Sequence, residues 1–87
     1  MPKFPKQAEA TRYIKNLLNS RNIGIEPGIL TLGEAEECQL FEYNNRCIAV
    51  DTKSGLWVGH LGGDWRHISS SCTVSAALTA IEFLLKD

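Results

Sequence analysis

The sequence lacks three features that would assign it to a well-defined class of protein. No uninterrupted apolar run approaches the ~20 residues that a membrane-spanning helix requires. The N-terminal stretch MPKFPKQAEA lacks the apolar segment of a signal peptide, so we expect a cytoplasmic protein. The three cysteines form no CxxC pair, and an odd number of them without close spacing fits reduced thiols better than a disulfide scaffold.

Patterns that bind metals or phosphates are also missing. No CxxC or HxxxH pair suggests a structural metal, and His60 and His67 lack an obvious third ligand, although Cys47 is conceivable. Gly62-Gly63 precedes a predicted strand rather than a helix, so it is not a phosphate-binding loop of the usual kind. We therefore expect no metal and no cofactor. Since no catalytic arrangement is recognisable, we expect a binding domain rather than an enzyme.

The composition is that of an ordinary globular protein, but its charge is uneven. The 87 residues are 44% hydrophobic and 22% charged, which is enough for one modest core, so we expect residues 1–87 to form a single domain. Residues 1–22 carry five basic residues and one acidic residue, whereas residues 23–45 carry five acidic residues and no basic one. We favour an arrangement in which these two segments lie beside each other, in one molecule or in a symmetric pair.

Amphipathic helices are predicted at both ends of the chain. Pro5 suits the first turn of a helix that continues to about Ser20. The apolar residues of this segment have helical spacing, and they are Ala10, Tyr13, Ile14, Leu17 and Leu18. A second helix is expected from about Thr73 to Leu85, with Ser69–Ser71 supplying its capping chemistry. Its predicted buried stripe consists of Val74, Ala77, Leu78, Ile81, Leu84 and Leu85.

Between the helices the alternation of side chains predicts antiparallel strands. Residues 39–43 and 46–51 form a hairpin around Asn44-Asn45, because asparagine tolerates the positive φ of a two-residue turn. This register pairs Phe41 with Ile48. A second hairpin is expected to turn at residues 53–55, with a left-handed Gly55, and to pair Val50 with Val58. Residues 25–37 stay open: 29–32 suit a short strand, and 33–37 suit a helical turn or an acidic loop.

These elements combine into a two-layer α+β domain in the order α-β-β-β-α. An antiparallel meander of three to four strands carries the N-terminal and C-terminal helices on its aliphatic face. The other face of the sheet is then solvated, covered by residues 25–37, or covered by another molecule.

The length of the loop at Gly62-Gly63 decides where the two tryptophans point. A two-residue loop sends Trp57 and Trp65 to opposite faces of the sheet. A three-residue loop with a left-handed Gly63 pairs Gly59 with Trp65 and puts both tryptophans on the face away from the helices. We favour the longer loop because it leaves the core face more aliphatic, and because a large aromatic ring compensates for a glycine in a neighbouring strand.

This second face is the predicted functional surface, although both tryptophans would be plain core if another segment folded over it. Tryptophan is enriched at interface hot spots, and an exposed apolar patch marks a binding surface. The candidate binding residues are Leu40, Ala49, Trp57, Gly59, Trp65 and His67. We expect a protein-interaction or self-association module, with a protein partner or a homodimer and no membrane partner.

Two alternatives belong to different classes of function. The first is a small-molecule or enzymatic pocket near Trp65, His67 and Cys72, since a helix N-terminus lowers the pKa of a thiol. The second and weaker alternative is nucleic-acid binding through the basic first helix, with phosphate contacts from Lys3, Lys6, Arg12 and Lys15. No aromatic residue interleaves with those charges, which makes this alternative the least favoured.

Overall fold

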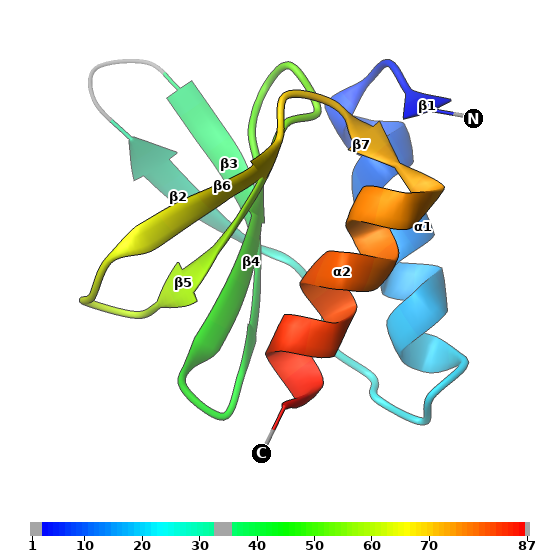
Figure 1. The fold of residues 1–87 in the computed structure, drawn as a ribbon, viewed down its shortest axis with the longest axis vertical. Coiled ribbons are helices and arrows are strands. Elements are labelled where there is room, and N and C mark those ends of the chain that lie inside the picture. The colour runs from blue at the N-terminus through cyan, green and yellow to red at the C-terminus, as the bar shows by residue number, and fades with distance from the viewer. Residues whose placement is uncertain (1–2, 33–35, 87) are drawn as a thin grey trace.

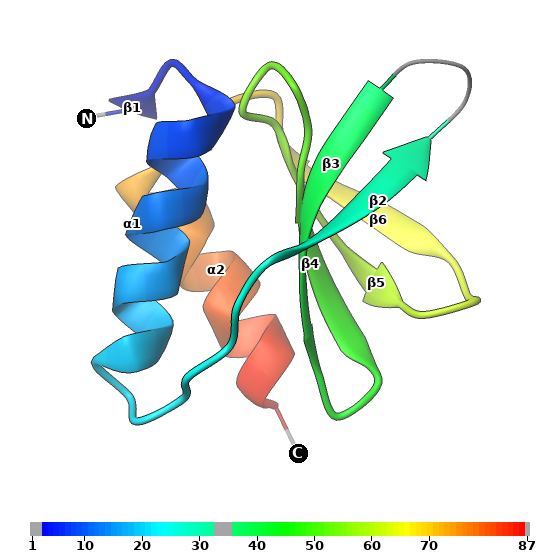
Figure 2. The ribbon, with the colours of Figure 1, turned by 180° about the vertical axis from the view of Figure 1, so that it is seen from behind.

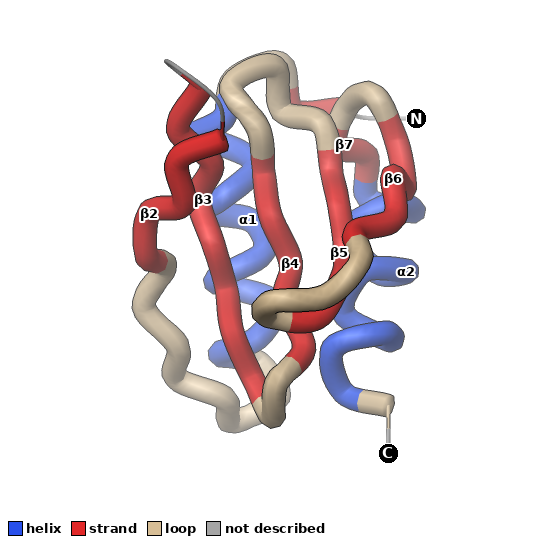
Figure 3. The backbone as a smooth tube through the Cα atoms, turned by 90° about the vertical axis from the view of Figure 1, so that its left-hand side faces the viewer, coloured by secondary structure: helices blue, strands red, loops and turns tan. Residues whose placement is uncertain are grey.

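The computed structural model describes residues 3–32 and 36–86, which fold into two layers (Figure 1). Helices α1 (Gln7–Asn19) and α2 (Val74–Leu85) form one layer, and an antiparallel sheet forms the other (Figure 2). In Figure 3 the sheet faces the viewer and both helices lie behind it. The predicted two-layer α+β architecture, with a helix at each end of the meander, is therefore confirmed. Neither helix of the described residues is long and apolar enough to cross a membrane.

The meander has five strands rather than the three to four that we expected. They follow one another in sequence order and are β2 (Gly28–Leu32), β3 (Glu36–Tyr43), β4 (Arg46–Val50), β5 (Leu56–His60) and β6 (Trp65–Ser69). The fifth strand comes from the segment left open, because Gly28–Leu32 pairs along the first half of β3. Glu36 and Glu37 belong to β3, and the rest of the predicted helical turn or loop, residues 33–35, lies outside the described residues.

A second, two-stranded sheet connects the N-terminus to the start of α2. Strand β1 (Lys3–Phe4) pairs with β7 (Cys72–Thr73), and Phe4 stacks on Tyr13 of α1 with ring centroids 4.6 Å apart. Because residues 72–73 are extended, α2 begins only at Val74. Its N-cap is Thr73, whose Oγ1 accepts a hydrogen bond from the backbone N–H of Ala76 at 3.0 Å.

The expected capping of α2 by Ser69–Ser71 is wrong, since these serines bond to one another. The Ser69 hydroxyl donates to the carbonyl oxygen of Ser71 at 2.6 Å and accepts from its N–H at 3.3 Å. The serines therefore form a local turn between β6 and β7 and leave the helix N-terminus to Thr73.

The first predicted hairpin is confirmed in register and in turn type. Phe41 pairs with Ile48 and Tyr43 with Arg46. Asn44 and Asn45 have φ values of 51° and 70°, which is the left-handed pair that a type I′ turn requires.

The second hairpin is displaced from its predicted register by two residues, and Val50 pairs with Leu56 instead of Val58. The turn keeps three residues but lies one residue earlier, because the Asp51 N–H donates to the carbonyl oxygen of Gly55 at 2.9 Å. The side chain of Asp51 organises this turn, since its Oδ1 accepts the N–H of Lys53 at 2.9 Å and of Gly55 at 2.8 Å. The left-handed residue is Ser54, with a φ of 62°, and not Gly55. A shift of two residues preserves the face of every side chain, so the predicted faces survive this error.

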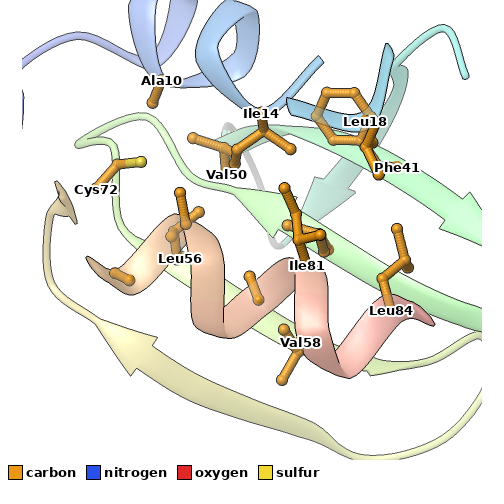
Figure 4. Packing of buried hydrophobic residues seen from close by; sticks show 14 residues of the cluster. Ala10, Ile14, Leu18, Phe41, Val50, Leu56, Val58, Cys72, Ile81 and Leu84 are labelled. Atoms are coloured by element: carbon orange, nitrogen blue, oxygen red, sulfur yellow. The ribbon is translucent and has the colours of Figure 1, made fainter. Parts of the chain in front are cut away.

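The core lies between the helices and the near face of the sheet (Figure 4). Its large, fully buried side chains come from both layers and are Ile14, Leu18, Phe41, Ile48, Val50, Leu56, Val58, Ile81 and Leu84. Burying one such side chain stabilises the fold by about 1.5–3 kcal/mol. Leu78, which we expected in the stripe of α2, is 37% exposed, because Ala76, Ala77 and Ala80 occupy the buried side of the helix.

Candidate functional site on the second face of the sheet

The second face of the sheet is the one turned away from α1 and α2. Side chains alternate between the faces of a strand, so this face is built from every second residue. One cross-strand row runs from Leu40 through Ala49 and Trp57 to His67, and the neighbouring row runs from Cys47 through Gly59 to Trp65. The favoured register, in which Gly59 pairs with Trp65 and both tryptophans share a face, is therefore confirmed.

The turn that produces this register differs in one detail from the prediction. The N–H of Gly63 donates to the carbonyl oxygen of His60 at 2.8 Å, and Gly62 has a φ of +79°. Positive φ at the third position is the requirement of a type II turn, so the left-handed residue is Gly62 rather than Gly63.

Trp65 lies directly against the backbone of β5. A Cβ atom at Gly59 would lie 2.9 Å from Cδ2 of Trp65 and 2.6 Å from the carbonyl oxygen of Asp64. Glycine at position 59 therefore makes room for the indole ring and for the return of the chain into β6.

Trp57 is fixed by two polar neighbours. Its indole N–H donates to Oδ2 of Asp51 at 3.1 Å, and its ring tilts against the imidazole of His67 with centroids 4.6 Å apart. Burial alone would raise the pKa of Asp51. Hydrogen bonds from Trp57, Gly55 and Lys53, together with the charge of His67, outweigh burial and lower that pKa. The carboxylate that orients the Trp57 indole is therefore charged near neutral pH.

Both tryptophans line a cavity of about 240 Å³, and both remain partly exposed. The other lining residues are Leu30 and Ala49. In a flat sheet with strands ~4.8 Å apart, Leu30 in β2 and Trp65 in β6 would be separated by roughly 19 Å. Because both line one cavity, the sheet must coil so that its two edge strands approach each other over Ala49.

The second face is thus neither bare nor covered by a helix. Of the candidate residues, Ala49, Trp57 and Trp65 line the cavity, Gly59 supports the ring of Trp65, and His67 contacts Trp57. Leu40 lies beside Ala49 in the sheet but does not line the cavity.

Leu30 was absent from the predicted site, because the possible strand at residues 29–32 was not placed in the sheet. The Ile-Leu-Thr-Leu run of residues 29–32 is the signal that places it, once this run is taken as an edge strand of the same sheet.

Two buried thiols, those of Cys38 and Cys47, belong to this face of the sheet. Burial, followed by the charge of Glu36, raises the pKa of Cys38, and burial, followed by the charge of Glu42, raises that of Cys47. Both thiols are therefore protonated near neutral pH. Glu42 pairs with Cys47 across the sheet and Glu36 precedes Cys38 by two residues in β3, so strand alternation places both carboxylates on the second face.

The alternative pocket of Trp65, His67 and Cys72 is not assembled. Cys72 lies in the core between the helices and the sheet, where burial raises its pKa to about 11. Trp65 lines the cavity on the opposite side of the sheet. Cys72 therefore neither shares a cavity with Trp65 nor has the lowered pKa of a nucleophilic thiol.

The basic first helix borders a separate, open groove of about 340 Å³. Arg12 and Lys15 line it together with Thr11 and Gln39. The Lys15 ammonium forms an ion pair with Glu26 at 2.9 Å, which brings the basic and acidic segments together as expected. The Thr11 Oγ1 is buried and has no hydrogen-bond partner within the part of the chain that the structure describes.

Neither the arrangement of potential metal ligands nor comparison with known proteins indicates a function. Within the described residues, no group of three or more His, Cys, Asp or Glu side chains could hold a metal ion. Comparison with known proteins finds no matching family model, no matching curated protein and no matching solved structure.

Proposed function

We propose that this chain is a protein-interaction module that binds through the cavity of its second face. The observation that carries the proposal is an apolar cavity walled by two partly exposed tryptophans on a sheet face that neither helix covers. Tryptophan is one of the residues enriched among the hot spots that dominate the binding energy of protein interfaces. The partner is another protein or a second copy of this chain.

The size of the cavity favours a side chain as its occupant over a free small molecule. Pockets that enclose drug-sized ligands measure ~300–1,000 Å³, and this cavity is smaller, at about 240 Å³. Its lining residues Leu30, Ala49, Trp57 and Trp65 offer mainly apolar surface. One side chain projecting from a partner would fill it, and the rest of the partner would lie over the rim.

Two measurements test whether the second face is free to bind. Acrylamide quenching of the Trp57→Phe and Trp65→Phe variants reports on the one tryptophan that each variant retains. We expect both tryptophans to be quenched, because both are partly exposed. Size-exclusion chromatography with light scattering then detects self-association, which Trp65→Ala should abolish if the partner is a second copy.

A strict monomer whose tryptophans both resist the quencher would contradict the proposal. In that case the cavity is closed in solution, and Trp57 and Trp65 act only as packing residues.

A further inference from the structure

We infer that the occupant of the cavity is cationic, and that the partner is an extended basic segment of another protein inserting a Lys or Arg side chain between Trp57 and Trp65. This inference rests on the proposed function of the second face and identifies its partner by chemistry. Three features of the described residues support it: the sign of the surrounding charge, the chemistry of the walls, and the location of the protein's own cations.

Among the described strand residues, the second face carries two carboxylates, and its one basic side chain is the imidazole of His67, whose charge lowers the pKa of Asp51. Glu36 and Glu42 follow the alternation of β3 onto the second face, and their charges raise the pKa values of Cys38 and Cys47 on that face. Asp51 adds a third carboxylate, which is bonded to the Trp57 indole. A cation in the cavity would therefore lie in a favourable field.

The two arginines of the sheet, in β4 and β6, lie on the face that is turned toward the helices. Arg46 and Arg66 both place their guanidinium groups over the ring of Phe83, at 5.5 and 5.8 Å from its centroid. Phe83 is therefore an aromatic ring already occupied by the protein's own cations. Among the described strand residues, no Lys or Arg alternates onto the second face, so the two tryptophans have no ammonium or guanidinium partner from these strands.

The walls themselves suit a cation. A tryptophan face is the strongest aromatic partner for an ammonium or guanidinium group. The hydrogen bond from Trp57 to the Asp51 carboxylate, at 3.1 Å, shifts electron density into the indole ring and strengthens this attraction. Leu30 and Ala49 complete a lining that would contact the aliphatic stem of a Lys or Arg side chain.

The same charges disfavour a face-to-face dimer. A two-fold axis brings identical patches together, so Glu36, Glu42 and Asp51 of one copy would approach those of the other. Like charges opposed across an interface weaken association. A basic segment has no such penalty, and for this reason the charge pattern selects it over a symmetric second copy.

The test uses three peptides that differ at one position. Acetylated, amidated pentapeptides with central Lys, Arg or norleucine between glycines are titrated into the ¹⁵N-labelled full chain, and the indole N–H signals of Trp57 and Trp65 are followed. We expect the Lys and Arg peptides to shift both signals and to bind at least fivefold more tightly than the norleucine peptide. Raising NaCl from 50 to 500 mM should weaken only the cationic peptides.

A pair of matched substitutions locates the charge effect. Glu42→Gln removes a carboxylate of the second face, opposite Cys47 in the sheet, and should weaken binding of the Lys and Arg peptides at least twofold. Glu82→Gln makes the same chemical change at an exposed position on α2 and should leave binding unchanged.

Three outcomes would overturn the inference. Equal binding of the norleucine peptide leaves an apolar binding face and removes the cationic partner. A dimer that buries Trp65 and excludes the peptides replaces the basic segment with a second copy. If no peptide shifts either indole signal, the basic partner fails; if acrylamide also fails to reach either tryptophan, the proposed function fails with it.

Discussion

The packing of the Trp65 ring against Gly59 gives the most specific prediction about the structure of the second face. Gly59→Ala adds one methyl group, which would lie 2.6 Å from the carbonyl oxygen of Asp64 and 2.9 Å from the Trp65 ring. Both distances are shorter than real Cβ atoms show, and one of the contacts is to backbone, which cannot rotate away. Overpacking of this kind costs about 1–3 kcal/mol. We expect urea unfolding to show a loss of that size in Gly59→Ala.

Gly28→Ala provides a matched control in the same sheet. Gly28 lies on the second face of the edge strand β2, and a Cβ atom there would meet nothing within 4 Å. Since its φ lies outside the left-handed region, alanine should be neutral or should stabilise the protein by about 0.4–1 kcal/mol, because it restricts the unfolded chain.

A double substitution separates the two contacts at Gly59. In the Trp65→Ala background the clash with the ring is absent but the contact with Asp64 persists, so Gly59→Ala should cost less than in the parent without becoming neutral. If Gly59→Ala is as stable as Gly28→Ala, or if its cost is the same with and without Trp65, the ring does not lie on Gly59 and the reasoning about this face is refuted.

Three further predictions concern the cap, the turn and the buried thiol. Thr73→Ala should lower the free energy of unfolding by about 1 kcal/mol, because it removes the N-cap of α2. The control Ser70→Ala should change it by less than about 0.5 kcal/mol, since Ser70 is exposed. Equal effects of the two substitutions would contradict Thr73 as the cap. The fold lowers the pKa of Asp51 below its ordinary value of 3.8. The stabilisation that its charged carboxylate provides is therefore fully present above pH 3.8 and is lost as the pH falls through the lower pKa of the folded state. The difference in urea midpoint between the parent and Asp51→Asn should therefore shrink as pH falls from 5 to 3, and a constant difference would contradict the charge effect. Because the pKa of Cys72 is raised to about 11, a variant retaining Cys72 alone should react with iodoacetamide at pH 8 far more slowly when native than when unfolded, and equal rates would show that the thiol is not buried.

Local signals in the sequence specify the hairpins and the faces of the strands. Asn44-Asn45 selects a two-residue turn because both residues tolerate positive φ, so the β3–β4 register could be predicted. The β4–β5 register could not, because hydrogen bonds to the Asp51 side chain set the turn one residue earlier than the position of Gly55 indicates. The faces were nevertheless predicted correctly, since the error was two residues and side chains alternate with a period of two.

The cavity depends on tertiary structure that no local pattern specifies. The pairing of Gly59 with Trp65 follows from the loop at Gly62-Gly63, so the shared face of the tryptophans could be predicted. The approach of Leu30 to Trp65 requires the whole sheet to coil, and that curvature comes from all the strands together. The cap at Thr73 depends likewise on the pairing of β7 with β1, two segments at opposite ends of the chain.

The most direct test of the central claim is to find which residues a cationic probe contacts. Isotope-filtered nuclear Overhauser spectra of the labelled chain with tetramethylammonium should show contacts from the probe's methyl protons to Leu30, Ala49, Trp57 and Trp65, the four residues that line the cavity. Phe83 is the internal control, because Arg46 and Arg66 already lie over its ring. Contacts to Phe83 in place of the tryptophans, or equal contacts from the neutral isostere neopentyl alcohol, would contradict the account.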